Sequence, residues 1–552
     1  MEKSSGGKRC LSAADNPPSA LCLSTVWSCE SARLFQPERL WYRLSMNLAR
    51  TFWNRLRRAD SRVLLEQLEP TGEVTWRQTR GAFLTEVSRW MAALQAAGIQ
   101  PGDRVALSLK KSEGLVTAHL AVLGVGASAV PLNPALSPRE VEAVLAQANV
   151  RLAITQSESV SKSPEITAAV HGPWWVVDRT DSLPAHTIFL SDILAASQPG
   201  PEPTERDDND VALLLFTSGT TGTPKGVGLT HQNLRANLQA LLVDTWEMNE
   251  NDRLLHVLPP HHLHGLGLGL YGTLFVGNTA TLLERFDPLV TLRVLGSHHM
   301  SLFMGVPTMY HRMLEVAGDF SLASMRLFTS GSAPLSPETF RRFQERFGFA
   351  MVERYGLTET AINTSNPLHG VCKPGSVGLP LPGIEVGIFD PQTRQRLPQG
   401  EKGEVWVRGA NVFGGYWNNP QATAAAFCDG WFRTGDLGAF SADGYLTILG
   451  RIKELIIVGG TNVTPGEVER VLEVDAGVAE CAVAGIPDAD LGECIAAFIV
   501  PRLGEESVAL EQRLRARAGQ DLAPYKRPRL YQFLAALPRN AIGKVERNKL
   551  RL

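Results

Sequence analysis

The sequence predicts an α/β fold, in which a large N-terminal domain of layered α/β subdomains and a small β subdomain precede a small α+β domain. Three observations support this prediction. Between residues 64 and 336, short apolar runs alternate with segments of helical periodicity, as in parallel sheets covered by helices. Residues 375–409 instead show short strands separated by turns. After Gly450 a helix start and new strands follow, so a second domain begins near Arg451.

The first elements form a βαβ unit, because residues 105–109 and 129–132 are expected as buried strands on either side of a helix at 114–123. Further strands are expected at apolar runs bounded by turn residues. These runs are Val150–Ile154, Trp174–Val177, Leu213–Phe216, Gly383–Phe389 and Gly403–Val407. In the last domain, Val463–Arg470 opens a helix and Val478–Ile486 is expected as a strand.

Composition excludes several classes of protein. The chain has 552 residues, a net charge of −2 and no tract rich in Lys or Arg, so nucleic-acid binding is not expected. Seven cysteines without metal-ligand spacing favour a reducing compartment, the cytoplasm or alternatively the mitochondrial matrix. Residues 1–45 lack apolar periodicity and are expected to be a disordered extension. The longest uncharged stretch, Leu263–Leu283, is expected to be a buried helix and strand rather than a membrane span.

The stretch Leu213–Gly226 carries the most chemical information. An apolar run leads into a loop of Gly, Ser and Thr with one lysine, which offers backbone N–H and hydroxyl groups to a polyphosphate. A Walker A loop ends in Gly-Lys-Ser/Thr, whereas Lys225 lies between Pro224 and Gly226. The loop therefore predicts phosphate binding by a protein other than an ordinary kinase or GTPase.

Five segments, in this order, resemble the motifs of the acyl-adenylate-forming superfamily, which includes acyl-CoA synthetases, peptide-synthetase adenylation domains and luciferases. They are Thr217–Lys225, Glu353–Thr360, Gly430–Asp436, Gly450–Ile456 and Pro538–Lys544. The resemblance extends from about Met46 to the end and is greatest to malonyl-CoA synthetases. It implies an adenylate-forming domain at 46–449, a hinge at 450–453 and a mobile C-terminal domain at 454–552.

The resemblance also implies where ATP and Mg²⁺ bind. Thr217 and Glu359 would lie near magnesium, for which a carboxylate is a suitable hard ligand. Asp436 and Arg451 would bind the ribose, and Tyr355 would stack on the adenine. The other implied nucleotide-binding residues are Ser218, Gly219, Thr220, Thr221, Gly222 and Lys225 at the phosphates, and Gly331, Ser332, Ala333, Arg354, Gly356 and Thr358 around the adenine.

The catalytic lysine implied by the resemblance is Lys544, which would bridge the substrate carboxylate and the α-phosphate of ATP. Positive charge at this point stabilises the transition state, in which negative charge develops. Lys453 would be the hinge about which the C-terminal domain rotates before thioester formation. The loop Val458–Asn462 would then line the path of the coenzyme A thiol, and Gly459 and Gly460 suit the close passage of an extended chain.

Two segments resemble malonyl-CoA synthetases more than fatty-acid enzymes. They are Met304–Leu314 and Thr360–Pro367. Arg312 falls on the arginine assigned to the distal malonate carboxylate, and a guanidinium can bind a carboxylate with two hydrogen bonds. His262 and His264 align with pocket residues that gate the acyl site or donate to a carboxylate. However, the glycine-rich segment after His264 is apolar and could admit a longer acyl chain.

The sequence thus predicts an ATP-dependent acyl-CoA synthetase that forms an acyl-AMP intermediate and transfers the acyl group to coenzyme A. Malonate or a similar short dicarboxylate is the expected acid. One alternative is a medium-chain or aryl acyl-CoA ligase, and another is an adenylating enzyme that loads a carrier protein. A non-catalytic nucleotide-binding protein is disfavoured because Lys544, Glu359, Asp436 and Arg451 are all present.

Overall fold

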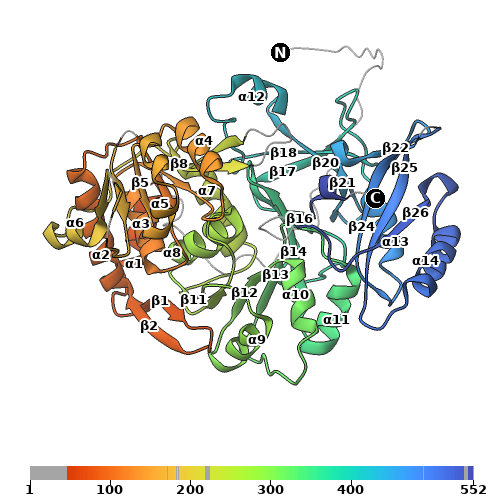
Figure 1. The fold of residues 1–552 in the computed structure, drawn as a ribbon, viewed down its shortest axis with the longest axis horizontal. Helices are drawn as coiled ribbons and strands as arrows, with labels where there is room; N and C mark the ends of the chain where they lie inside the picture. Colours follow the sequence, from red (N-terminus) through yellow and green to blue (C-terminus); the bar gives the residue numbers. More distant parts are fainter. Residues whose placement is uncertain are drawn as a thin grey trace, which may run out of the picture. The chain divides into compact units, whose positions relative to one another are not determined.

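The computed structural model describes residues 47–170, 172–181, 183–184, 186–217, 224–488, 490–539 and 545–550. Residues 46–552 form one compact unit. The extension predicted for residues 1–45 lies outside the described residues, so the helices and strands in Figure 1 belong to the unit of residues 46–552.

The first large sheet has seven strands in the order β7-β6-β5-β3-β4-β8-β9. Neighbouring strands are parallel, except that β8 and β9 form an antiparallel hairpin. Most of its strand residues are buried, as expected for a parallel sheet with both faces covered. The strand bounds are β3 Arg104–Ser108, β4 Ser128–Pro131, β5 Leu152–Thr155, β6 Trp174–Val176, β7 Thr187–Phe189, β8 Val211–Thr217 and β9 Lys225–Thr230.

The second large sheet has nine strands in the order β16-β15-β14-β13-β12-β10-β11-β1-β2. Its central strands, from β14 to β1, are parallel, and antiparallel strands flank them at both ends. The strand bounds are β1 Val63–Leu68, β2 Val74–Thr79, β10 Arg253–His256, β11 Thr279–Leu283, β12 Leu302–Gly305, β13 Leu327–Ser330, β14 Met351–Leu357, β15 Ala361–Ser365 and β16 Leu379–Pro380.

Helices connect and cover these two sheets. Helix α3 (Glu113–Gly124) packs on β3 and β4, and α1 (Leu48–Leu56) packs on α3 and on α8 (Gly272–Val276). Residues 115–124 of α3 are all buried, the pattern of a helix covered on every side. The other helices of this part are α2 Arg80–Ala96, α4 Pro138–Ala148, α5 Ser157–Lys162, α6 Leu190–Ala196, α7 His231–Leu238, α9 Pro288–Ser297, α10 Pro307–Leu314 and α11 Pro337–Phe347.

The carboxyl ends of the two sheets are tied together by one buried lysine. Lys111 follows β3 of the first sheet, and its ammonium group donates to the carbonyl oxygens of Leu283 (2.8 Å) and His256 (3.3 Å) at the ends of β11 and β10. Burial lowers the pKa of Lys111 to about 7. Loops that leave the carboxyl ends of parallel strands commonly carry the binding residues of α/β proteins, and here those of both sheets meet.

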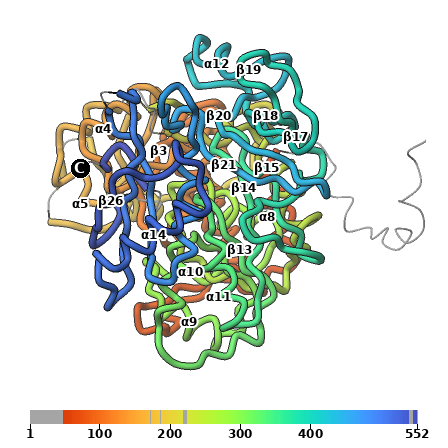
Figure 2. Tube along the Cα trace, turned by 90° about the vertical axis from the view of Figure 1, so that its right-hand side faces the viewer, coloured from red at the N-terminus to blue at the C-terminus, as the bar shows by residue number. Residues whose placement is uncertain are grey.

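Two smaller sheets follow in the chain; the first is antiparallel, and in the second only the pairing of β25 with β26 is parallel. The first contains β17 Ile384–Phe389, β18 Gly403–Gly409, β19 Phe427–Cys428, β20 Trp431–Phe440 and β21 Leu446–Arg451, with α12 Pro420–Ala426 beside β19. The second contains β22 Ile456–Val458, β23 Thr461–Val463, β24 Val478–Asp488, β25 Gly492–Pro501 and β26 Leu530–Phe533, and α13 Pro465–Leu472 and α14 Ser507–Asp521 accompany it. These blue C-terminal elements lie on the side of the green helices α10 and α11 (Figures 1 and 2).

The predicted fold class is confirmed, with two layered α/β sheets, a small β subdomain and an α+β C-terminal region. The uncharged stretch 263–283 forms a buried π-helix at His264–Tyr271, then α8 and β11, which agrees with the predicted helix and strand. Within the described part of the chain, no helix is long and apolar enough to cross a membrane.

Candidate active site

A large pocket of about 990 Å³ lies where residues of both large sheets, the small β sheet and the C-terminal region come together. Many predicted site residues line it, and they come from loops far apart in the sequence. They are Thr217, Lys225, His262, His264, Arg312, Ser332, Arg354, Gly356, Thr358, Glu359, Arg451 and Lys453.

One end of the pocket is formed by the β8–β9 hairpin. Thr217 and Lys225 pair across the hairpin, and the Thr217 hydroxyl donates to the Lys225 carbonyl oxygen at 3.4 Å. The predicted phosphate-binding residues Ser218, Gly219, Thr220, Thr221 and Gly222 lie outside the described residues. Thr217 and Lys225, which flank this segment, both line the pocket.

Glu359 lies in the same part of the pocket, and a residue that the sequence analysis missed holds it in place. The Tyr416 hydroxyl donates to Glu359 Oε1 at 3.0 Å, and the Lys225 ammonium lies 4.9 Å from the centre of the Tyr416 ring. Burial and the Glu359 carboxylate raise the pKa of Tyr416. In the sequence, Tyr416 is recognisable only as a tyrosine that follows Gly414 and Gly415. This local pattern does not show that its hydroxyl contacts Glu359.

An ion pair between Asp436 and Arg451 forms the second polar group. These residues are partners in the antiparallel β20–β21 register, and Arg451 Nε lies 2.8 Å from Asp436 Oδ1. The Tyr355 hydroxyl donates to Asp436 Oδ2 at 2.6 Å. Burial alone would lower the pKa of Arg451, but the neighbouring acidic groups, Asp436 first among them, together outweigh burial and raise it. The three predicted ribose and adenine residues therefore form one hydrogen-bonded group.

The loop after β13 supplies Gly331, Ser332 and Ala333. A Cβ atom on Gly331 would lie 2.5 Å from Arg354 Cζ, so only glycine fits beside that guanidinium. Ser332 has a φ of 71°, which is unfavourable for a residue other than glycine and is often found at functional sites. Its hydroxyl lies 3.2 Å from His264 Nδ1, which links this loop to the π-helix. Gly331 and Ala333 do not themselves line the pocket.

The opposite end of the pocket contains the half-buried His262, the buried His264 and the exposed Arg312. Burial holds the pKa of His262 at about 4 and that of His264 well below its usual value, so both imidazoles are neutral at pH 7. Neither Nε2 atom has a hydrogen-bond partner. Arg312 lines the pocket from α10 but is an exposed residue, and its Cζ atom lies 6.0 Å from the Phe286 ring centre.

The C-terminal region contributes Lys453, Glu480 and Arg539 to the pocket wall. Arg539 pairs with Glu480 at 3.0 Å and forms an isolated β-bridge with Val545. The predicted catalytic Lys544 lies outside the described residues, between these two bridge partners in sequence. In contrast, the predicted thiol-path residues Gly459 and Gly460 form the exposed turn between β22 and β23 and do not line the pocket.

Glu353, which precedes the pocket residue Arg354, leads to a prediction about stability. It is 4% exposed, and burial raises its pKa to about 8, although Oε1 accepts a hydrogen bond from the Leu335 N–H. From about pH 4.5, the value for an unburied glutamate, up to pH 8, the folded chain keeps a proton that the unfolded chain has released. Stability should therefore fall as the pH rises through this window.

Glu353→Gln should remove this pH-dependent loss, because the amide stays neutral at every pH. We expect the variant to exceed the wild type in unfolding free energy at pH 9 by on the order of a few kcal/mol, with the difference shrinking towards pH 5. Denaturant unfolding at pH 5, 7 and 9 measures this. The exposed Glu345→Gln on α11 serves as the control and should follow the wild type. Parallel pH profiles for Glu353→Gln and wild type would contradict the assignment.

Comparisons with known proteins extend this picture. Residues 53–417 match the AMP-binding enzyme family, and residues 467–544 match the AMP-binding enzyme C-terminal domain. A long-chain-fatty-acid–CoA ligase of Bacillus subtilis is 35% identical over 497 residues, covering 85% of this chain and 88% of the relative. A malonate–CoA ligase of Arabidopsis thaliana is 33% identical over 488 residues, covering 82% and 78%. ATP-bound MatB from Rhodopseudomonas palustris is 35% identical, with a TM-score of 0.84 over 92% of this chain and 98% of that chain.

Proposed function

Because this chain belongs to the AMP-binding enzyme family, we propose that it is an AMP-forming acyl-CoA ligase that activates malonate or a similar short dicarboxylate. One observation carries this proposal. Thr217 and Lys225 from the predicted phosphate site, Arg451 from the predicted ribose site, and His262, His264 and Arg312 from the predicted acid site all line one pocket. A pocket of this composition suits a substrate with one reacting carboxylate and a second anionic group.

In the first half-reaction, an oxygen of the acid attacks the α-phosphorus of ATP, a new P–O bond forms and pyrophosphate leaves. Lys544 is the residue proposed to bridge the attacking carboxylate and the α-phosphate. The β8–β9 loop holds the other phosphates, while Asp436 accepts hydrogen bonds from the ribose hydroxyls. Most of the catalytic effect then comes from positioning and from positive charge at the reacting oxygens.

Thr217 and Glu359 are suited to hold Mg²⁺. Both have oxygen atoms at the pocket, and the described contacts of the Glu359 carboxylate engage only Oε1. Among the described residues, no cluster of three or more His, Cys, Asp or Glu side chains could form an all-protein metal site. Magnesium is usually held by one or two protein ligands with phosphate and water oxygens, and when bound it would neutralise phosphate charge.

In the second half-reaction, the thiol of coenzyme A attacks the acyl carbonyl carbon, the thioester bond forms and AMP leaves. The β22–β23 turn with Gly459 and Gly460 must then approach the acyl group, although it is exposed and away from the pocket here. Lys453 lies in the short 3₁₀ segment Ile452–Glu454 between the two small sheets, which is where a rotation of the C-terminal region would occur. This rotation replaces the Lys544 loop by the glycine turn.

The packing of the glycine-rich π-helix supports a short acid. Added Cβ atoms on Gly267 and Gly269 would lie 2.6 Å from Leu263 Cδ1 and from His256 Cδ2, and one on Gly265 would lie 2.2 Å from the Pro259 carbonyl oxygen. These glycines therefore permit close packing at their own positions, which is the reason to favour a short acid. Apolar residues such as Leu268 and Met309 do line the pocket, which keeps a medium-chain or aryl acid as the second candidate.

A screen of acids tests the proposal. With ATP and coenzyme A, malonate should give the highest kcat/KM in a series that runs through succinate to octanoate and benzoate. AMP and pyrophosphate should form in equal amounts, and both should depend on the acid. Release of ADP would refute the adenylation route. A preference for octanoate or benzoate over every dicarboxylate would refute the substrate assignment and favour the second candidate.

A further inference from the structure

We propose that Arg354, rather than Arg312, fixes the second carboxylate of the acid, and that His264 donates to the same carboxylate. This inference rests on the proposed function, because it names the residues that would select a dicarboxylate. It departs from the resemblance, which groups Arg354 with the adenine site and assigns the distal carboxylate to Arg312.

The first reason is a buried charge without a counter-ion. Arg354 is 5% exposed and lines the pocket, and its Nε and Nη2 atoms have no hydrogen-bond partner. Among the described residues, no Asp or Glu forms an ion pair with it. Burial lowers the pKa of Arg354 to about 10, so the side chain stays charged at pH 7. An uncompensated buried guanidinium is costly, and an anionic ligand in the pocket would remove that cost.

The neighbouring acid does not supply the missing charge. Glu353 precedes Arg354 on β14, and side chains alternate between the two faces of a strand. Its Oε1 atom accepts from the Leu335 N–H, and its raised pKa keeps it uncharged at neutral pH. The group that influences Arg354 most, apart from burial, is the fully buried Tyr310, whose hydroxyl donates to the Thr329 carbonyl oxygen at 2.5 Å.

The second reason is the direction in which Arg354 points. Tyr355 follows it on the strand and reaches Asp436 with its hydroxyl group, so Tyr355 faces the proposed ribose site. The alternation of the strand turns Arg354 to the other face. There it packs against Gly331 and lies close enough to His264 to lower the pKa of that imidazole. Arg354 is therefore on the acid side of β14, and Tyr355 is on the nucleotide side.

His264 completes the site. It is 8% exposed, its Nδ1 lies 3.2 Å from the Ser332 hydroxyl, and its Nε2 has no partner. If the Ser332 hydroxyl donates to Nδ1, the neutral ring carries its proton on Nε2 and can donate to a carboxylate. A guanidinium and an Nε2–H, both buried and both facing one pocket, form a preformed site for one carboxylate.

Arg312 lacks these features. It is exposed to solvent, and its guanidinium lies over Phe286 at 6.0 Å. A carboxylate bound there would keep much of its hydration, and an exposed ion pair contributes little to affinity. Arg312 can attract an anionic acid to the pocket, but a buried site discriminates more strongly between dicarboxylates and monocarboxylates.

Steady-state kinetics of Arg354→Met test the inference. The KM for malonate should rise about 100-fold, because a charged hydrogen-bond donor is lost from a buried site, while the KM for ATP stays within about threefold. Butyrate, which lacks the second carboxylate, should not lose kcat/KM. Arg354→Lys keeps the positive charge but loses the bidentate hydrogen bonding of the guanidinium, so its KM for malonate should lie between those of the wild type and Arg354→Met. Arg312→Met should change the KM for malonate less than about fivefold.

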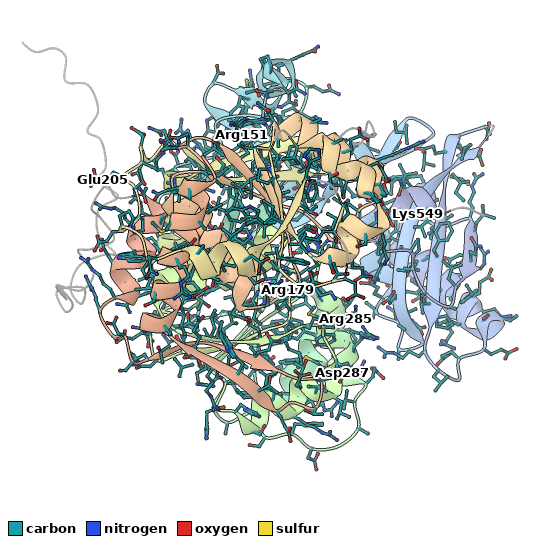
Figure 3. The ribbon with its side chains drawn as sticks, turned by 60° about the vertical axis from the view of Figure 1, so that its left-hand side comes forward. Arg151, Arg179, Glu205, Arg285, Asp287 and Lys549 are labelled. Atoms are coloured by element: carbon teal, nitrogen blue, oxygen red, sulfur yellow. The ribbon has the colours of Figure 1, made fainter. Side chains whose placement is uncertain are left out.

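The control is Arg285→Gln, since Arg285 precedes Phe286 and its side chain is 89% exposed (Figure 3); it should match the wild type. Calorimetric measurement of AMP binding shows whether Arg354→Met is folded and has an intact nucleotide site. If that variant does not fold, the same KM measurements on Arg354→Lys and His264→Gln test the inference. A rise in the KM for ATP with an unchanged KM for malonate would place Arg354 at the nucleotide and overturn the inference. If the wild-type enzyme activates no dicarboxylate, the proposed function itself fails.

Discussion

Lys544→Ala should lower the rate of acyl-adenylate formation by about 10²- to 10³-fold, because it removes the positive charge proposed to lie at the attacking carboxylate and the α-phosphate. Thioester formation from a supplied acyl adenylate should stay close to wild type, since that step is proposed to use the other orientation of the C-terminal region. Acid-dependent exchange of pyrophosphate into ATP measures the first step. Release of AMP from synthetic acyl adenylate and coenzyme A measures the second.

Lys549→Ala is the matched control for this experiment. Lys549, labelled in Figure 3, is a lysine five positions further on whose side chain is 60% exposed and pairs with Glu546 at 2.7 Å. It should leave both half-reactions unchanged. Equal losses in the two half-reactions of Lys544→Ala would show that the lysine supports the fold or coenzyme A binding instead. Full exchange activity in Lys544→Ala would contradict its catalytic role outright.

Asp436→Asn should raise the KM for ATP about 100-fold and leave the KM for the acid within about threefold. Asp436 is 2% exposed and accepts from the Tyr355 hydroxyl at 2.6 Å beside its ion pair with Arg451 at 2.8 Å. Removing its charge weakens the proposed acceptor for the ribose hydroxyls and leaves Arg451 without its closest counter-ion. Titration with AMP, followed by calorimetry, checks the loss without turnover.

The control for this variant lies in the same hairpin. Asp443 is 54% exposed and pairs with Lys373, so Asp443→Asn should bind AMP as the wild type does. If Asp436→Asn bound AMP normally but raised the KM for the acid, Asp436 would belong to the acid site. The acid, and not the ribose, would then have to bind next to β20. If Asp436→Asn lowered only the thermal stability and left the KM values normal, the ion pair of Asp436 with Arg451 would have a structural role alone.

Much of the fold could be predicted because local pattern and tertiary structure agree. Residues 105–132 combine two short apolar runs with an apolar helical segment, and they form β3, α3 and β4 as expected. The uncharged stretch 263–283 also forms the predicted helix and strand. The pattern did not predict that the first helical segment, His264–Tyr271, is a π-helix, because a glycine-rich sequence alone does not determine which carbonyl each N–H reaches.

The site was harder to predict than the fold. Motifs identify which residues belong to the nucleotide, but they do not show on which side of a strand each one lies. Arg354 and Arg312 are both arginines within matched segments, and only their burial and partners distinguish them. Tyr416 was missed for a related reason: its contact with Glu359 joins residues 57 positions apart, a separation over which no local pattern operates.

The alternation of side chains along β14 has a consequence for how this enzyme can evolve. Arg354 and Tyr355 are adjacent in sequence, yet we propose that they face different ligands, the acid and the nucleotide, across the thickness of one sheet. Natural selection can therefore alter the residue at 354, and with it the acids that are accepted, while the neighbouring tyrosine preserves ATP use. Duplicated genes could diverge in metabolic role through single codon changes here, without passing through an intermediate that has lost adenylation.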